Sequence, residues 1–425
     1  MNFKETRLEN GLTIVTDRMD HLRSVALGVW VNSGSRDEHN EEHGLAHLLE
    51  HMAFKGTNTR SAVDIAEEIE AVGGELNAAT SVENTAYYAR VLSADVELAV
   101  DILADILQNS TFDPEELAKE QHVILQEIGA SMDMPEDLAF DRFQCAAFPD
   151  QPVGRPILGT PESVSGFDPT AISKYLKRQY HAASMVVSAA GDIEHEAFVD
   201  LVKQKFSDLP GGTLQPCEPA RYKGGEWIEE RDLQEAQILL GFEGLDYEHD
   251  DFFAAQLLAS VLGGGMSSRL FQEVREKRGL CYSVYAFHWA FSDTGIFGVH
   301  AATGAEDIEK LMPVIINELY RIKEDLSTEE LNRSKAQMRA NLYMSLESPA
   351  ARATQIARHI MLFGRLITPD EQIERLDAIS VKDIKRVAER LFINTRPTLS
   401  AIGPVAKLIT LEEVANQLSV PQAAE

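Results

Sequence analysis

The sequence has little cysteine and no long apolar run. Its three cysteines, Cys145, Cys217 and Cys281, are far apart and form no Cys-x-x-Cys pair, so we expect neither a disulfide framework nor a cysteine zinc site. A reducing compartment suits such a chain best. No stretch approaches the roughly 18 apolar residues of a membrane helix, and the first residues lack the apolar region of a signal peptide. We therefore expect a soluble, cytoplasmic protein without a membrane partner.

Positive charge is also scarce. Lys and Arg number 39 against 68 for Asp and Glu, which gives a formal net charge of −29. This balance argues against nucleic acid and anionic membrane surfaces as partners. It suits a cationic peptide ligand, although an acidic surface can also serve solubility alone. With 425 residues, of which 44% are hydrophobic, the chain is long enough for two or three domains with substantial cores.

The most informative stretch runs from residue 43 to residue 54. It contains His47-x-x-Glu50-His51, the inverted form of the zinc-peptidase motif His-Glu-x-x-His. Positions i, i+3 and i+4 share one face of a helix, so His47 and His51 can hold one ion with Glu50 beside it. Two imidazoles are good ligands for Zn²⁺, and a third ligand would leave a fourth position for water. The alternative is a solvated polar face without metal, because such short patterns recur by accident.

An internal repeat organises the rest of the chain. Composition turns to Pro, Gly and Thr between residues 209 and 225, and the same order of expected strands and helices begins again after this linker. Residues 47–51, 112–117 and 185–191 recur at 256–260, 326–331 and 397–403, with offsets of 209, 214 and 212. Coincidence does not explain three nearly constant offsets. We predict an α+β fold with two homologous domains, each a mixed or antiparallel sheet with covering helices, at 1–210 and 226–425 with a linker at 211–225.

The two copies differ in their chemistry. In the second copy the leucines of the motif remain, but its three polar residues are replaced by Gln256, Ala259 and Ser260. The polar residues of the first copy therefore serve something other than folding.

The same comparison selects a third metal ligand. The helix expected at 113–128 carries four acids, of which Glu115 and Glu116 recur in the second copy as Glu329 and Glu330. Glu120 and Glu127 become Ser334 and Asn341, so they disappear together with the histidines. Glu127 also lies in an apolar setting, which is a poor place for an unpaired charge. We take Glu127 as the ligand, with Glu120 holding a histidine or the bound water; the alternative is two surface acids.

These residues resemble the pitrilysin/insulinase superfamily, most closely the mitochondrial-processing-peptidase-like zinc peptidases of bacteria. The family pattern is His-x-x-Glu-His, then about 76 residues, then a glutamate ligand; Glu127 lies 76 residues after His51. Glu120 matches the glutamate that the family has seven residues before that ligand. The resemblance covers essentially the whole chain. It implies one Zn²⁺ and two similar domains per subunit, and a dimer in which two such units close as a clamshell around an unfolded peptide.

The resemblance implies a second motif in the C-terminal half. Arg275 and Tyr282, which follow the glycine run 263–265, have the spacing of a family pair that reaches the chamber of the zinc half. Because this chain holds both motifs, the resemblance implies a homodimer whose zinc site is completed by Arg275 and Tyr282 of the partner subunit. The alternative for the two residues is a helix-end salt bridge and a core aromatic. The family's long glycine-rich insertion is absent, which leaves strict presequence specificity without support.

Further residues match the family's substrate contacts. Asn77 and Ala78 match an edge strand along which relatives lay the substrate as an added β-strand. Phe54 matches a residue lining the pocket just after the cleaved bond. Asp137 and Asp141 match acids that hold an arginine upstream of the cut in processing peptidases; the alternative for them is a solvated helical face.

The function expected from these observations is a zinc endopeptidase that acts on extended, basic peptides. Glu50 would act as the general base, Tyr282 would donate to the oxyanion and Arg275 would anchor the peptide backbone. Two alternatives remain open. One is a non-catalytic scaffold or assembly subunit, such as the peptidase-like core subunits of a respiratory complex, and the other is a zinc-dependent peptide-binding protein without turnover.

Overall fold

The structure of the protein is a computed structural model that describes residues 2–393 and 395–419. Packing divides the chain into two compact units. Unit 1 comprises Met1–Gly129, Arg155–Glu218 and Tyr343–Leu366, and unit 2 comprises Ala130–Gly154, Pro219–Leu342 and Ile367–Glu425. Each unit is built around one β-sheet.

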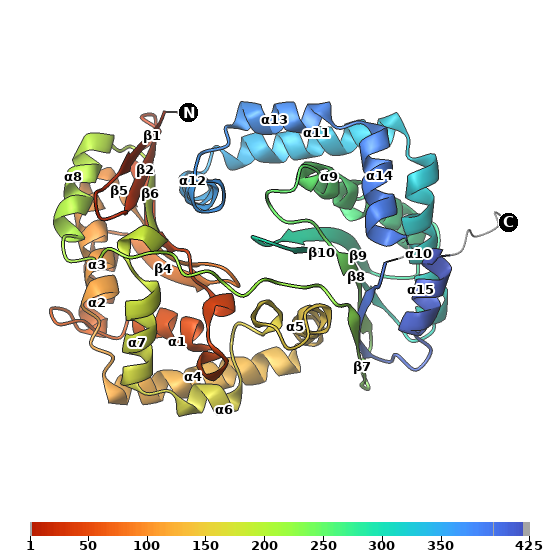
Figure 1. Ribbon diagram of the computed structural model, residues 1–425, viewed down its shortest axis with the longest axis horizontal. Coiled ribbons are helices and arrows are strands. Elements are labelled where there is room, and N and C mark those ends of the chain that lie inside the picture. The colour runs from red at the N-terminus through yellow and green to blue at the C-terminus, as the bar shows by residue number, and fades with distance from the viewer. Residues whose placement is uncertain (1, 394, 420–425) are drawn as a thin grey trace. The chain divides into compact units, whose positions relative to one another are not determined.

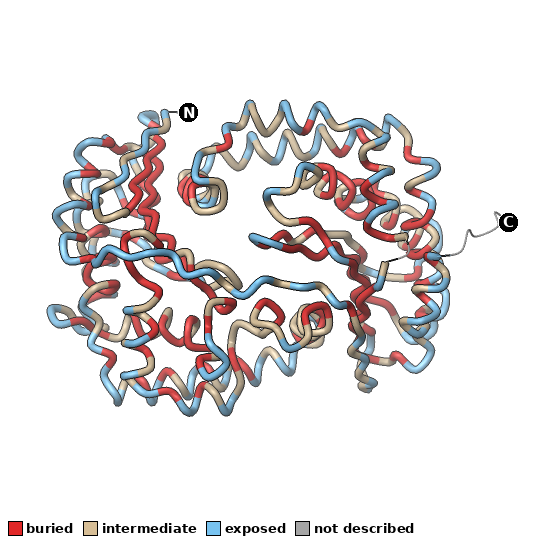
Figure 2. Tube along the Cα trace, viewed as in Figure 1, coloured by how far each residue is buried: buried red, intermediate tan, exposed pale blue. Residues whose placement is uncertain are grey.

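The sheet of unit 1 has six strands, in the order β1-β2-β6-β3-β5-β4. The β2–β6 pair is parallel, and the other pairs are antiparallel. The central strands are rich in apolar residues and buried on both faces (Figure 2). The strands are β1 (Phe3–Arg7), β2 (Thr13–Arg18), β3 (Ser24–Val31), β4 (Glu75–Thr80), β5 (Thr85–Leu92) and β6 (Met185–Gly191).

The sheet of unit 2 repeats five of these strands. Its order, β7-β11-β8-β10-β9, matches β2-β6-β3-β5-β4 strand for strand, and its one parallel pair, β7–β11, takes the place of β2–β6. The predicted internal repeat and the α+β class with mixed sheets are thereby confirmed. The strands are β7 (Gly225–Glu230), β8 (Ala236–Glu243), β9 (Ser283–Ala290), β10 (Gly295–Thr303) and β11 (Thr398–Gly403).

Helices cover the sheets of both units. In unit 1, α1 packs on β4 and α3 on β3 and β5, whereas in unit 2, α9 packs on β9 and α14 on β8. Unit 1 contains α1 (Leu45–Met52), α2 (Ala62–Ala71), α3 (Val96–Gln108), most of α4 (Pro114–Asp133), α6 (Pro161–Gly166), α7 (Pro169–Gln179) and α8 (His195–Lys205). Unit 2 contains α9 (Phe252–Gly263), α10 (Ile308–Asp325), most of α11 (Thr328–Ser345), α13 (Pro369–Ala378), α14 (Val381–Phe392) and α15 (Leu411–Ser419).

One helix of each sequence half packs on the sheet of the other half. Helix α5 (Pro135–Ala147) packs on β7, β8 and β11, and α12 (Pro349–Phe363) packs on β2, β3 and β6 (Figure 1). The Ser188 hydroxyl in β6 donates to the Ala353 carbonyl of α12 at 2.8 Å, and the Ser400 hydroxyl in β11 donates to the Ala139 carbonyl of α5 at 2.8 Å. The division into 1–210, 211–225 and 226–425 thus stays a prediction about the repeat along the chain. By packing, α5 belongs to unit 2 and α12 belongs to unit 1.

The described residues contain no helix that is long and apolar enough to cross a membrane.

Candidate metal centre

Helix α1 carries the motif on one face. Leu45, Leu48, Leu49 and Met52 are fully buried in the core of unit 1, and this apolar stripe fixes the rotation of the helix. The histidines lie on the opposite side, with 13% of the His47 side chain and 18% of the His51 side chain exposed. The predicted helical spacing thus places both imidazoles at one partly open surface.

The start of α1 is fixed by two groups. Gly44 has φ +93°, and a Cβ there would lie 2.8 Å from the Cα of Gly159, so only glycine fits. The Glu38 carboxylate accepts hydrogen bonds from the backbone N–H groups of Gly44 at 2.9 Å and Ala46 at 2.7 Å. Burial raises the pKa of Glu38 to about 8, although these two donors act to lower it. Glu38 therefore holds the turn that ends one residue before His47.

Glu127 on α4 completes a cluster of three donors. Its Oε2 lies 3.8 Å from Nε2 of His47 and 3.7 Å from Nε2 of His51. The three donor atoms all lie within 4.8 Å of one another, and this is the one group of potential metal ligands found among the described residues. The Glu127 side chain is 41% exposed, so the centre opens toward solvent on its side.

The donor set fits Zn²⁺. Two atoms that bind one tetrahedral Zn²⁺ lie about 3.4 Å apart, so small side-chain rotations suffice to bring these donors to an ion. Oε2 of Glu127 and Oε2 of Glu50 are buried without a hydrogen-bond partner among the described residues. Such atoms are costly to leave unsatisfied, and a cation with its bound water would satisfy them. Burial, followed by the nearby His51, lowers the pKa of His47 to about 4, so its imidazole is neutral at pH 7, as a ligand must be.

Glu120 supports His51 from behind. Its Oε2 lies 3.0 Å from Nδ1 of His51, and because a carboxylate only accepts, the imidazole donates from Nδ1 and keeps its Nε2 lone pair for the metal. The other oxygen, Oε1, lies 2.7 Å from Nζ of Lys55. Burial acts to raise the pKa of Glu120, but the hydrogen bonds from Lys55 and His51 outweigh it and lower the pKa.

The predicted substrate residues of unit 1 lie on two elements. Phe54 follows the end of α1, and its ring centroid is 6.3 Å from that of Tyr87. Asn77 and Ala78 lie in β4, which is an edge strand of the sheet. Asn77 is exposed and Ala78 is buried. Their positions agree with an open strand edge beside α1, which packs on β4.

The remaining predicted residues belong to unit 2. Arg275 lies in a π-helical turn, Phe271–Glu276, with its guanidinium 4.7 Å from the Phe271 ring and 5.3 Å from the Tyr282 ring. Tyr282 is 75% exposed, so it is not the core aromatic of the alternative interpretation. Asp137 and Asp141 lie on α5, where burial raises the pKa of Asp141 to about 6, with Asp137 also raising it.

Sequence reasoning missed Lys55 and Glu38. Lys55 lies four residues after His51, one helical turn beyond it, but an isolated lysine at that spacing carries no metal-binding signal. Glu38 lies in an acidic loop with Asp37, Glu41 and Glu42. Residue type alone does not show which of these acids contacts α1. Only the folded backbone brings these two side chains to the ends of α1.

Comparison with known proteins places these features in a family. The family model described as Insulinase (Peptidase family M16) matches residues 13–161, and the model described as Peptidase M16 inactive domain matches residues 166–338. A protein of Rickettsia bellii named as an uncharacterized zinc protease is 42% identical over 404 residues, which cover 95% of this chain and 98% of the relative.

Solved structures share the fold. A protease from Helicobacter pylori superposes with a TM-score of 0.89 at 23% identity and covers 95% of this chain and 99% of its own. A chain of Complex III2 from Candida albicans superposes with a TM-score of 0.88 at 22% identity and covers 98% of this chain and 100% of its own. Because a protease and a chain of that complex both match, the fold alone does not decide between enzyme and scaffold.

Proposed function

The chain belongs to the M16 (insulinase) family of peptidases and takes Zn²⁺ as its metal, and from this premise we propose that it is an endopeptidase that hydrolyses extended, basic peptides. The observation that carries the proposal is the convergence of His47, His51 and Glu127 within 4.8 Å of one another. Glu50 lies on the same helix, three residues after His47 and directly before His51, where a general base is needed.

Each residue of the centre has a role in the proposed reaction. His47, His51 and Glu127 hold the metal, and Glu120 fixes the tautomer of His51. Zn²⁺ supplies Lewis-acid chemistry when bound, activating a water molecule and polarising a carbonyl. Glu50 accepts the proton of the attacking water and returns it to the leaving amine. The buried Oε2 of Glu50, which has no hydrogen-bond partner among the described residues, supports this role.

The substrate class follows from charge and from the open strand edge. A net charge of −29 favours cationic peptides, and Asp137 and Asp141 are proposed to bind an arginine upstream of the cleaved bond. Asn77 and Ala78 of β4 are proposed to pair with the substrate as an added strand, with Phe54 lining the pocket after the cleaved bond.

We further propose that the active form is a cytoplasmic homodimer with a processing-peptidase-like chamber. In it, Arg275 and Tyr282 of the partner subunit complete each zinc site, Arg275 by anchoring the peptide backbone and Tyr282 by donating to the oxyanion. The exposure of Tyr282 and the position of the Arg275 guanidinium 5.3 Å from its ring centroid support a role outside the hydrophobic core.

A Glu50→Gln variant tests the function directly. The amide keeps the size and hydrogen-bonding capacity of the side chain but cannot take up a proton, so we expect stoichiometric zinc and a loss in kcat of about 10²–10⁴-fold on a quenched basic peptide. Glu115→Gln, on an exposed acid of the first turn of α4, is the matched control and should cleave like the wild type. Undiminished cleavage by Glu50→Gln would remove Glu50 from the mechanism.

The same measurements separate the alternatives. A scaffold subunit would cleave nothing, with or without zinc, and a zinc-dependent peptide-binding protein would bind zinc and peptide without forming products. The chain keeps every residue of the ligand set, which favours the enzyme over the scaffold, and product formation separates the enzyme from the peptide-binding protein.

A further inference from the structure

The segment that follows α1, residues 53–60, leads to α2 along the chain and pairs with the backbone just before α4; we call it the clamp segment. Its backbone pairs with the residues that lead into α4. Asn58 N–H donates to the Asn109 carbonyl at 3.2 Å, Thr111 N–H donates to the Gly56 carbonyl at 3.1 Å, and an isolated β-bridge joins Thr57 and Ser110. The clamp segment thus spans from the helix that carries the histidines to the start of the helix that carries Glu120 and Glu127.

Lys55 connects the clamp segment to the centre itself. Its Nζ lies 2.7 Å from Oε1 of Glu120, whose Oε2 lies 3.0 Å from Nδ1 of His51. Only 8% of the Glu120 side chain is exposed, against 30% for Lys55. A carboxylate buried to this degree requires a compensating charge, and Lys55 supplies it while directing the second oxygen toward the imidazole.

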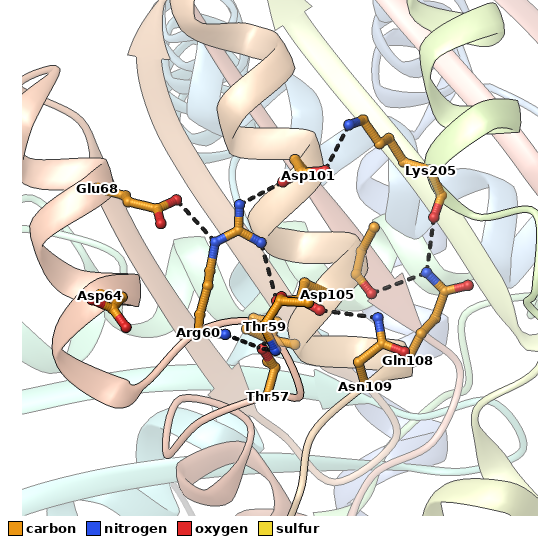
Figure 3. A network of polar contacts seen from close by, with 12 residues as sticks. Thr57, Thr59, Arg60, Asp64, Glu68, Asp101, Asp105, Gln108, Asn109 and Lys205 are labelled. Carbon is orange, nitrogen blue, oxygen red and sulfur yellow. Dashed lines mark hydrogen bonds and ion pairs between the residues drawn. The ribbon is translucent and has the colours of Figure 1, made fainter.

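A second set of contacts anchors the clamp segment on α3 (Figure 3). Asp105 of α3 accepts hydrogen bonds from the hydroxyls of Thr57 at 2.6 Å and Thr59 at 2.8 Å, and from the Arg60 guanidinium at 3.0 Å. Arg60 also pairs with Glu68 at 2.9 Å. Asp105 is 6% exposed, and hydrogen bonds to buried charged groups are among the strongest in proteins. The backbone on either side of Lys55 is therefore held at both ends, by α1 and by α3.

The second half of the chain lacks this arrangement. The offset of 209 that carries His47 onto Gln256 carries Lys55 onto Gly264, and Glu120 corresponds to Ser334. The lysine and its carboxylate partner thus disappear together with the metal ligands, although the surrounding fold is repeated. A contact needed only for packing would not be expected to follow the ligands in this way.

We propose that Lys55 is a positioning residue of the zinc centre. It holds Glu120 so that His51 donates from Nδ1 and presents Nε2 beside Glu127, and the Asp105–Arg60 cluster holds the clamp segment that carries Lys55. The inference rests on the proposed function only in that the cluster binds zinc. Residues that orient a ligand in this manner change metal affinity about 10–100-fold when they are replaced.

Zinc affinity of the full-length protein, measured by competition with a chromophoric chelator, tests the proposal. Lys55→Met keeps the unbranched apolar stem of the side chain and removes its charged end, and we expect its zinc dissociation constant to rise at least about tenfold. Lys55→Arg retains the charge and should stay within about threefold of the wild type. The matched control is Lys119→Met on α4, whose lysine pairs with Glu116 at 2.6 Å on the exposed surface; its affinity should be unchanged.

Two further measurements make the result decisive. Asp105→Asn loosens the clamp segment without touching Glu120, and it should weaken zinc binding by a few-fold. Thermal unfolding of each metal-free variant identifies those that fold like the wild type. Wild-type zinc affinity in folded Lys55→Met or, if that variant does not fold, in Asp105→Asn would overturn the proposal. Peptide cleavage is scored separately, because a wild type that binds zinc but cleaves nothing would remove the proposed function and leave Lys55 in its role.

Discussion

Helices α1 and α9 occupy equivalent places in the two sheets, and only one of them has metal ligands. The leucines of the motif are buried in both, Leu48 and Leu49 in α1 and Leu257 and Leu258 in α9. At the polar positions the helices diverge. Gln256, which replaces His47, donates to the backbone carbonyl of His288 in β9 at 3.2 Å, so a contact within the fold stands where the first half has a ligand.

The comparison separates what the fold requires from what the chemistry requires. Strand order, the parallel pair and the packing of one helix from the opposite half recur in both units. His47, Glu50, His51, Glu120 and Glu127 do not. The second half folds without these five polar residues, so the fold does not require them. Their presence in the first half is explained by the metal centre that they form. The second half has its own pair, the half-buried Arg275 and the exposed Tyr282, which lies outside α9.

The largest expected effect comes from mixing two variants, one inactivated in its zinc-binding half and the other in its C-terminal half. His47→Ala removes a metal ligand and Arg275→Ala removes the proposed peptide anchor, so each variant alone should be inactive. In a mixed dimer with two-fold symmetry, one site has an intact zinc half and an intact Arg275 from the partner subunit. An equimolar mixture after subunit exchange should therefore recover roughly a quarter of wild-type cleavage.

The control for this mixture is each variant incubated alone under the same exchange conditions. No recovery, after exchange is verified with labelled chains, would mean that each half acts within its own chain or that Arg275 has no catalytic part.

A smaller effect is expected from the contact between α9 and β9. His288 is buried, and its Nε2 accepts the backbone N–H of Leu245 at 3.0 Å. Burial lowers the pKa of His288 to about 4. Below its ordinary pKa of 6.5 the unfolded chain binds the proton while the folded chain does not, so stability is lost as pH falls from 6.5 to about 4. The loss should reach up to about 3 kcal/mol.

Denaturation at pH 7 and pH 4.5 measures this loss. A Trp30→Phe background leaves Trp227 and Trp289, both in unit 2, as the fluorescent reporters. His288→Gln retains a hydrogen-bonding side chain without the titration, and it should show a smaller difference between the two pH values than its parent. An equal difference in both proteins would assign the acid sensitivity to other groups.

The sequence predicted the repeat and the three donors because these depend on local pattern and on spacing. The loss of Glu120 and Glu127 in the second copy pointed to the helix that approaches the histidines. The placement of α5 and α12 was not predictable in this way. Leu138 and Phe143 show which face of α5 is buried, but an amphipathic pattern does not say which sheet covers that face. Lys55 was missed for a related reason. Its partner Glu120 is distant in sequence, and nothing in the residues around Lys55 distinguishes it from a surface lysine.

The smallest expected effect tests whether the exchanged helices are equivalent. Ser188 and Ser400 are both fully buried, and each donates at 2.8 Å to a carbonyl of the helix from the other half. Ser188→Ala and Ser400→Ala should each lower the free energy of unfolding by about 1 kcal/mol, because each leaves a buried carbonyl with one partner fewer. The two losses should add within about 0.5 kcal/mol in the double variant, since the bonds share no residue. Trp30, which packs in the same cluster as Ala353 and Ile356, reports on unit 1, and exposed Ser165→Ala is the control. Losses that differ by more than about 1 kcal/mol would show that the two helices, alike in sequence position and in hydrogen bonding, do not stabilise their units equally.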